Sequence, residues 1–526
     1  MGFPRGAVLA RQGEFEHSFF ILLDGSVEVV LERAGEPDEF IDVLGRGDCI
    51  GDLALLLGQE RTATVRALRD CRAVHIAEDD FLWLLHASPD FTIQLARTIG
   101  SRLQRRTTRV KSARPIERIA AVAASANVDM AGFCRELEAG LAGEVNRAGR
   151  PSVCELLDAG GAAEVGAQAT KSLRDADAVL FVGDAMHAPD TAGIGRLLDL
   201  LADFRPQPRL DLVLLHRTAP PFRDTVRWLR DRRLGWHHVE AGRQDDFHRL
   251  ARRLMGRATG LVLSGGGARG FAHIGVLRAF HEAGIPIDFI AGSSMGAIVG
   301  GQHAMGLGTD EMIALMRRSY VQRGGLPDLA IPYVAIRTGT ATDRQLRKMF
   351  GDTRIEDLRI PFFSVSSNLI TAETVLHERG RLWHGVRSSC SVPGLLPPVR
   401  SRGGFLVDGG LLDNLPVGAM RARCAGRVVG SDVSVAVDIQ MRDSARYKKR
   451  PFSALWPPSR MPGIGAILMR TAQLASVRDS RVAGIPADLY LHLPVDDVGM
   501  SDFVRLEEIV ARGHEYARQK FAGWQR

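Results

Sequence analysis

The chain has 526 residues, too many for one hydrophobic core, so we expect two to four domains. Its composition, with 45% hydrophobic and 25% charged residues, is ordinary for a soluble globular protein, and no apolar run reaches the roughly 18 residues that a membrane-spanning helix needs. The net charge of +7 mildly favours anionic partners, and it leaves nucleic acid, an anionic membrane surface and phosphorylated small molecules open.

The cysteines and the first residues indicate a compartment. Six cysteines are scattered without C-x-x-C spacing, which predicts reduced thiols in a cytosol. The N-terminus has no basic-then-apolar signal pattern. We therefore expect a cytoplasmic protein that contacts a membrane, if at all, peripherally at its inner face.

Residues 1 to about 90 have the pattern of a small β-barrel or jelly roll. The stretch "SFFILLDGSVEVVLE" predicts two strands joined as a hairpin through Asp24-Gly25, a dipeptide that suits tight turns. Glycines at turn-like intervals separate the further strands of this segment.

Within this segment, "IGDLALLLGQERTATVRA" resembles the phosphate cassette of cyclic nucleotide-binding domains. The resemblance implies that Arg61 clamps the phosphate of cyclic AMP or cyclic GMP beside a short helix that begins around Gly51 and Leu53. It also implies that Asp52 accepts the ribose hydroxyl and that Thr62 could meet a guanine amino group. Asp52 stands where the family usually has glutamate, and the family's first strand looks missing. A degenerate or purely structural domain is therefore the alternative.

A basic helical stretch follows from Phe91 and ends near Pro115. We interpret it as a solvated linker helix through which a homodimer could form, and contact with nucleic acid or anionic lipid is the alternative. The first domain with this linker is assigned to residues 1–114.

Residues 115–256 alternate between strand and helix patterns. The apolar runs "DAVLFVGDA" and "LDLVLLHR" predict buried strands, and "GIGRLLDLLADF" and "DDFHRLARRLMG" predict helices, so we expect a small open α/β sheet. We interpret it as a connector domain without its own chemistry. A nucleotide-responsive transcription factor would need a helix-turn-helix here, so no nucleic-acid partner is expected.

The stretch "GLVLSGGGARGFAHIGVL" begins at Gly260 and combines a strand, a glycine loop and a helix pattern. Gly265, Gly267 and Gly270 satisfy the dinucleotide fingerprint G-x-G-x-x-G. That fingerprint also requires an acidic residue at the end of the next strand, whereas the nearest candidate, Asp288, precedes the strand "FIAG". We therefore do not interpret this glycine loop as a dinucleotide-binding loop.

The sequence after that strand predicts a nucleophile elbow. Gly292 and Gly296 flank Ser294 in a G-x-S-x-G motif between a strand and a helix, which projects the serine hydroxyl into a site. The helix N-terminus favours developing negative charge there.

Two further motifs complete this interpretation. Gly265, Gly266 and Gly267 could offer backbone N–H donors to an oxyanion, while Arg269 either adds positive charge or pairs structurally. Downstream, "FLVDGG" places Asp408 at a strand end before Gly409 and Gly410, where a carboxylate can approach a hydroxyl.

This trio resembles the patatin-like phospholipases, with G-G-G-x-R-G, G-x-S-x-G and D-G-G in order, and "SSCSVPGLLPPV" resembles the family's proline segment. The resemblance covers about residues 260–416. It implies an α/β hydrolase domain with a parallel-rich sheet over residues 257–526. It also implies a dyad of nucleophile Ser294 and base Asp408, with Gly265 to Gly270 as the oxyanion loop. This dyad would act on phospholipid or lysophospholipid esters without a metal or catalytic cofactor. With the first two domains, the chain resembles bacterial relatives of neuropathy target esterase.

Two points stay open at this stage. The order Ser294, Asp408, His492 also fits a Ser-Asp-His triad, although His492 in "LYLHLPV" and His273 after the glycine loop suit structural roles better. The stretch from Arg446 to Arg470 mixes cations with Trp456, which suits a membrane interface or an ordinary proline-rich loop.

Overall fold

The computed structural model divides into two compact units, Met1–Arg109 and Val110–Arg526. It describes most of residues 1–95, 116–434 and 487–524, with gaps of three residues or more at 15–17, 33–38, 46–48, 145–151, 157–171, 203–207, 230–233 and 323–327 and shorter gaps elsewhere. Most of the predicted basic linker helix, with the dimer contact assigned to it, and the segment from Arg446 to Arg470 lie outside the described residues.

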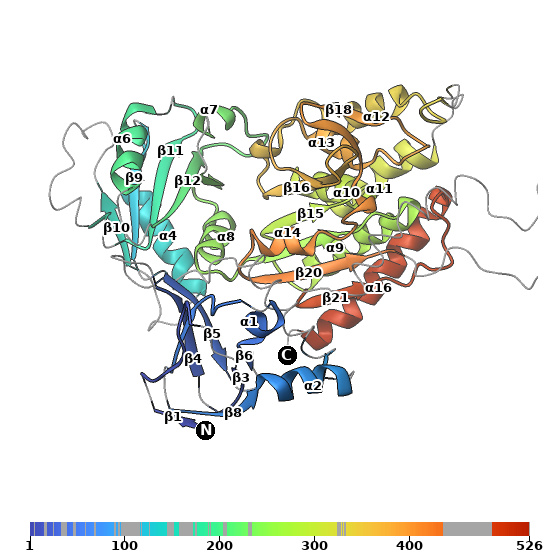
Figure 1. The fold of residues 1–526 in the computed structure, drawn as a ribbon. Helices are drawn as coiled ribbons and strands as arrows, with labels where there is room; N and C mark the ends of the chain where they lie inside the picture. The colour runs from blue at the N-terminus through green and yellow to red at the C-terminus, as the bar shows by residue number, and fades with distance from the viewer. Residues whose placement is uncertain are drawn as a thin grey trace, which may run out of the picture. The chain divides into compact units, whose positions relative to one another are not determined.

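The first unit contains two four-stranded antiparallel sheets, in the orders β1-β8-β3-β6 and β2-β7-β4-β5 (Figure 1). The strands are β1 (Gly2–Phe3), β2 (Val8–Ala10), β3 (Ser18–Asp24), β4 (Ser26–Leu31), β5 (Glu39–Gly45), β6 (Cys49–Ile50), β7 (Thr64–Ala67) and β8 (Cys71–Ala77). The helices are α1 (Asp52–Leu57) and α2 (Glu78–Ala87). Both sheets bury apolar residues in one core, and this confirms the predicted jelly-roll class.

The predicted hairpin between β3 and β4 is wrong. Both strands form where they were expected, but β3 pairs with β6 and β8, whereas β4 pairs with β5 and β7. The chain therefore passes from one sheet to the other between them. This crossing lets Phe20 of β3 and Val27 of β4 bury their side chains in the same core from opposite sides.

The second unit begins with the predicted α/β sheet, which is parallel throughout and has the order β10-β9-β11-β12-β13. Its strands are β9 (Arg118–Ala123), β10 (Ser152–Leu156), β11 (Ala178–Asp184), β12 (Arg209–His216) and β13 (Gly235–Glu240). Its helices are α4 (Met130–Glu144), α6 (Thr191–Ala202), α7 (Val226–Leu229) and α8 (Gln244–Leu254). Helices α4 and α8 pack on one face and α6 on the other, which explains why β11 is apolar along its whole length.

The larger sheet of this unit has the order β18-β19-β16-β15-β14-β20-β21, and β17 pairs with β16 (Figure 1). Its strands are β14 (Thr259–Leu263), β15 (Phe289–Gly292), β16 (Phe362–Asn368), β17 (Thr374–His377), β18 (Val399–Ser401), β19 (Gly404–Asp408), β20 (Arg427–Asp432) and β21 (Leu489–His492). The helices are α9 (Ala272–Glu282), α10 (Met295–Ala304), α11 (Thr309–Met316), α12 (Thr340–Phe350), α13 (Leu382–Ser389), α14 (Val417–Arg421) and α16 (Leu506–Trp524). Short helical turns are η3 (Gly267–Phe271), η4 (Arg317–Val321), η5 (Ile355–Asp357), η6 (Gly409–Leu411) and η7 (Phe503–Arg505).

Helices cover both faces of this sheet. Side chains of α9, α10 and α16 share a core with Leu261 and Ile290 on one face, and α14 packs against Val262 and Phe363 on the other. The central strands β14, β15, β16, β20 and β21 run parallel, and β17, β18 and β19 are antiparallel additions. The parallel-rich sheet predicted for this region is confirmed.

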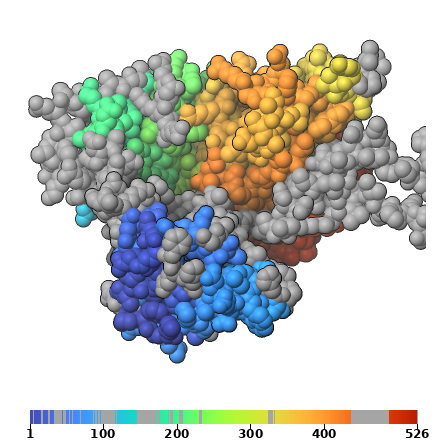
Figure 2. All heavy atoms as spheres, in the orientation of Figure 1, coloured from blue at the N-terminus to red at the C-terminus, as the bar shows by residue number. Residues whose placement is uncertain are grey.

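The two sheets of the second unit are joined by ion pairs. Arg252 of α8 donates to Asp288 just before β15 at 2.7 Å, and Asp288 is fully buried. Arg359 donates to Asp246 of α8 at 3.1 Å. In the space-filling view, the green surface of the smaller sheet adjoins the yellow-to-orange surface of the larger one (Figure 2). Among the described residues, no helix is both long and apolar enough to cross a membrane.

Candidate active site

Ser294 lies at a sharp turn between β15 and α10, as the elbow motif predicts. Its backbone has φ of 51° and ψ of −119°, a conformation that costs a residue other than glycine on the order of 1–3 kcal/mol. The Ser294 N–H donates to the hydroxyl of Ser389 at 2.9 Å, which helps to hold the turn. A Cβ on Gly296 would lie 2.3 Å from the Leu263 carbonyl oxygen, so helix α10 can pack this closely only with glycine there. Gly292 ends β15 on the other side of the turn.

Asp408 is the last residue of β19 and is buried. Its Oδ1 accepts the N–H of Gly410 at 2.8 Å, while Oδ2 is buried and accepts no backbone N–H among the described residues. Burial raises the pKa of Asp408 to about 6, and the Gly410 N–H and the Ser294 hydroxyl partly offset this rise. Asp408 is therefore a stronger base than an ordinary aspartate, beside the serine hydroxyl.

The sheet register explains how these two residues meet. Gly292 aligns with Ser364 on β16, and β16 continues past the end of β15. Ser366, two residues further along β16, aligns with Asp408 on the antiparallel strand β19. Asp408 therefore returns to the level of Ser294, which is likewise two residues beyond Gly292.

The glycine loop reaches the same pocket, and Asn414 fixes its position. The Gly265 N–H donates to Asn414 Oδ1 at 3.1 Å, and Asn414 Nδ2 donates to the Gly265 carbonyl at 3.2 Å. Because the Gly265 N–H already donates to Asn414, Gly266 and Gly267 are the two of the three expected glycines that remain as oxyanion donors. In the described part of the chain, no partner is found for the N–H groups of Gly266 and Gly267.

Arg269 and Gly270 lie behind the loop. The Nε of the buried Arg269 donates to the Val498 carbonyl at 2.6 Å, which favours the structural pairing over a charge in the site. Gly270 packs against Met295, at the first turn of α10.

The pocket at Ser294 is small, with a cavity volume of about 20 Å³, enough for about one water molecule, and it opens to solvent. Ser294, Asp408, Gly265, Gly266 and Asn414 form its polar part. The other residues that line it are Gly410, Val392, Pro393, Leu411 and Met500. The rest of its lining is mainly apolar, which suits contact with the carbon chain of an ester better than contact with a charged group.

The proline segment from Ser388 to Val399 supports both reactive residues. Ser389 accepts the N–H of Ser294, and the Ser391 carbonyl accepts the N–H of Asp408 at 3.0 Å. Sequence reasoning identified this segment by resemblance but missed Ser389 and Asn414 as site residues. An asparagine six residues after the aspartate carries no local pattern that could have revealed its partner.

Neither candidate histidine lies in this pocket. His273 is fully buried, and its ring nitrogens lie 2.8 Å from the Ser431 hydroxyl and 2.9 Å from the Ser264 carbonyl. Burial lowers the pKa of His273 to about 4, so the ring stays neutral and packs structurally. His492 ends β21, which lies three strand positions from β15, a separation of about 14 Å at the usual strand spacing.

In the first unit, the predicted nucleotide-binding residues gather around the start of α1. Gly51 precedes this helix, Asp52 and Leu53 open it, and the side chain of Asp52 is buried. Arg61 is buried as well, and its guanidinium donates to the carbonyl and hydroxyl oxygens of Ser18 at 2.5 and 3.1 Å. Thr62 is exposed beside it.

Comparisons with known proteins agree with this geometry. Residues 261–421 match the family "Patatin-like phospholipase", and residues 1–88 match the "Cyclic nucleotide-binding domain". The chain is 28% identical to "Lysophospholipase nte1" of Aspergillus fumigatus, 29% to that of Mycosarcoma maydis and 28% to that of Yarrowia lipolytica.

These alignments cover 98 to 99% of this chain but 41%, 33% and 45% of the respective relatives. The chain thus spans less than half the length of the curated relatives that it matches. The patatin-like match includes the predicted catalytic residues, and the cyclic nucleotide-binding match includes the predicted nucleotide-binding residues. The chain therefore combines a cyclic nucleotide-binding domain with a patatin-like phospholipase domain, and its relatives include lysophospholipases of the neuropathy target esterase type.

Proposed function

We propose that this protein hydrolyses carboxylic esters of phospholipids or lysophospholipids through a Ser294–Asp408 dyad. One observation carries the proposal: a strained serine and a buried aspartate of raised pKa line the same mainly apolar pocket. The lysophospholipase names of the relatives favour lipid esters over other esters.

The two side chains would divide the proton transfers between them. Asp408 Oδ2 takes the proton of Ser294 as its hydroxyl attacks the ester carbonyl, and a tetrahedral oxyanion forms. The leaving alcohol then takes this proton from Asp408, and a water molecule deacylates the serine by the same route. The N–H groups of Gly266 and Gly267 would donate to the oxyanion, and Asn414 would position their loop.

Exposed apolar side chains near the pocket supply a surface for lipid. Tyr333 is 94% exposed, Val334 60% and Ile336 40%, although these residues are apolar or aromatic. The Ile336 N–H donates to the Gly394 carbonyl at 2.9 Å, directly after Val392 and Pro393, which line the pocket. We infer that this patch, Tyr333–Ile336, rests on the apolar zone of a membrane surface while the ester enters the pocket.

A substrate panel tests the proposed activity. Purified protein is incubated with lysophosphatidylcholine, a diacyl phosphatidylcholine, a triacylglycerol and p-nitrophenyl butyrate, and released fatty acid or nitrophenol is measured. We expect release from the phospholipid or lysophospholipid at a higher kcat/KM than from the triacylglycerol. Triacylglycerol as the best substrate, or no release from any ester, would contradict the proposal.

The apolar patch makes a second prediction. Tyr333→Ser combined with Val334→Ser should lower hydrolysis of vesicle-bound substrate about tenfold, because it removes apolar area from the membrane contact, and should leave p-nitrophenyl butyrate hydrolysis unchanged. The matched control is Val504→Ser, at an even more exposed valine that lies in η7. Equal loss on both substrates would assign the patch to the fold or the site instead.

We also propose that the first domain binds cyclic AMP or cyclic GMP and that the nucleotide regulates hydrolysis. The support is the buried Arg61 beside Gly51 and Asp52 at the start of α1, in a segment that matches the cyclic nucleotide-binding domain. In calorimetry with the full chain, we expect either nucleotide to bind and Arg61→Ala to lose that binding by at least about a hundredfold, because the arginine supplies the charge that pairs with the phosphate. Arg11→Ala, at an exposed arginine of the same domain, is the control. Undiminished binding by Arg61→Ala would refute this role for the arginine.

A further inference from the structure

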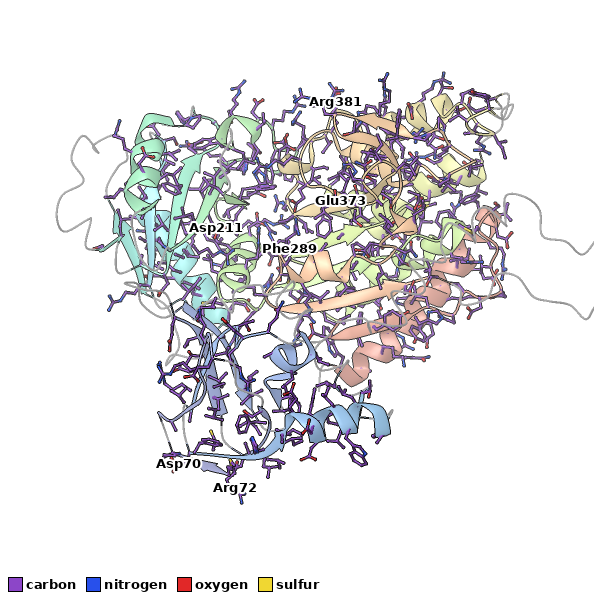
Figure 3. The ribbon with its side chains drawn as sticks, viewed as in Figure 1. Asp70, Arg72, Asp211, Phe289, Glu373 and Arg381 are labelled. Carbon is purple, nitrogen blue, oxygen red and sulfur yellow. The ribbon has the colours of Figure 1, made fainter. Side chains whose placement is uncertain are left out.

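A second pocket lies in the seam between the two sheets of the Val110–Arg526 unit. Its cavity volume is about 210 Å³, and it shares no lining residue with the pocket at Ser294. Asp211 of β12 and Phe289 of β15 line it from opposite sides and lie near each other between the sheets (Figure 3). This volume is below the roughly 300–1,000 Å³ of sites for drug-sized ligands, so the pocket suits a small ligand.

The charges around this pocket do not balance. Arg209, Arg253 and Arg423 line it, against the carboxylates of Asp211 and Glu378. Asp211 forms an ion pair with Arg209, with 2.6 Å between Arg209 Nε and Asp211 Oδ2. Glu378 forms an ion pair with Arg423. One cation, Arg253, therefore remains.

Arg253 is buried, with 9% of its surface exposed. Its Nη1 donates to the Trp236 carbonyl at 3.2 Å, and its Nε is buried without a hydrogen-bond partner. In the part of the chain that the structure describes, no carboxylate lies within 4.0 Å of this guanidinium. Burial lowers the pKa of Arg253 to about 9, with Arg209 and Arg249 adding repulsion against the longer-range attraction of Asp211 and Asp288.

A buried cation without a carboxylate in direct contact is costly to the fold, so its presence here points to an anion that pairs with it when bound. Because the surplus is a single charge, the matching ligand carries one negative charge. Arginine can grip a carboxylate through two parallel N–H groups, and the free Nε offers one of them.

The remaining walls are flat and apolar. Trp236, Phe289 and Phe363 line the pocket, and the Arg253 guanidinium lies over the Phe289 ring, 4.4 Å from its centroid. Aromatic walls favour a planar apolar body next to the acid group.

We propose that this pocket binds a small organic monocarboxylate with a flat apolar body, whose carboxylate pairs with Arg253. The site is separate from the catalytic pocket. Phe289 opens β15, and Ser294 follows five residues later, about 16 Å along an extended chain. The proposal stands on the seam pocket alone and does not require the proposed esterase activity.

The test compares matched probes on the full chain. 2-Naphthoate and 2-naphthamide have the same body and differ in charge, and benzoate offers a smaller ring. Binding is measured by calorimetry and by the rise in Tm, for the wild type, Arg253→Met and the control Arg402→Met at an exposed arginine. We expect naphthoate to bind at least about tenfold more tightly than naphthamide, and Arg253→Met alone to remove this preference.

Further readouts separate the alternatives. Arg253→Met without ligand should be at least as stable as the wild type, because the substitution removes a buried charge that has no carboxylate in direct contact. Ser294→Ala should bind naphthoate unchanged. The proposal is overturned if neither carboxylate binds the wild type, if naphthoate and naphthamide bind equally, or if Arg253→Met keeps the preference. If Arg253→Met does not fold, Trp236→Leu, which keeps the cation, becomes the deciding variant. The proposal then holds if Trp236→Leu folds and weakens naphthoate binding at least about tenfold. Otherwise Arg253 is a structural partner and the proposal fails.

Discussion

Ser294→Ala is expected to lower kcat for ester hydrolysis by about 10⁴-fold or more, because it removes the atom that attacks the carbonyl. The protein should stay folded, since alanine has the same Cβ as serine and the backbone N–H of residue 294 can still donate its hydrogen bond to the Ser389 hydroxyl. Initial rates on the best ester of the panel, with circular dichroism as the check on folding, measure this effect.

The control for this prediction decides between dyad and triad. His492→Ala should keep activity within about tenfold, because His492 lies on a strand three positions from β15 and is not asked to move a proton. His273→Ala is a poorer control, since it would empty a buried site and leave the Ser264 carbonyl and Ser431 hydroxyl without their partner. If His492→Ala is as inactive as Ser294→Ala while folded, a dyad is the wrong mechanism.

Asp408→Asn should remove at least about 10³-fold of activity, because an amide cannot take the serine proton. In the wild type, the carboxylate must be ionised to act as the base, and its pKa is raised to about 6. We therefore expect kcat/KM to fall about tenfold for each pH unit below about 6 and to level off above it. Asp413→Asn is the matched control, because burial also raises the pKa of Asp413 to about 6 but its side chain does not line the pocket. If Asp413→Asn abolishes the fall in kcat/KM below pH 6, the group that titrates in this profile is Asp413 and not Asp408.

The same substitution should stabilise the protein at neutral pH. A carboxyl whose pKa is raised in the folded state binds its proton more strongly there than in the unfolded chain, so stability falls as pH rises from about 4 to about 6. The amide of the Asp408→Asn variant carries no charge to bury, which would recover up to about 3 kcal/mol above pH 6. Thermal unfolding of Asp408→Asn at pH 4 and at pH 7 measures this, and a gain that is equal at both values would contradict the assignment.

Short sequence motifs predicted those parts of the site that depend on a few consecutive residues. The elbow, the glycine loop and the D-G-G turn each depend on a few consecutive residues at a strand end, so their positions followed from the sequence. The pairing of β3 did not, because an Asp-Gly turn permits a hairpin but β3 and β4 pair with strands that lie further along the chain.

Contacts between distant residues were not predictable in the same way. Gly265 and Asn414 are 149 residues apart, and Ser294 and Ser389 are 95 apart, so their hydrogen bonds depend on the assembled sheet. The surplus charge of Arg253 could not be foreseen either. It becomes visible only when Arg209 and Arg423 are seen to occupy the two carboxylates beside it.

The ion pair between Arg252 and Asp288 has a practical consequence for dissecting this chain. A cut at residue 257 falls between α8, which ends at Leu254, and β14, which begins at Thr259, and so separates the patatin-like domain from the smaller sheet. Such a fragment would keep a carboxylate in its interior while losing the guanidinium that neutralises it, and it would expose the ring of Phe289, which the Arg253 side chain covers. A recombinant fragment intended for crystallisation or inhibitor screening should therefore begin before β9, so that it includes the smaller sheet and its arginines together with the patatin-like domain.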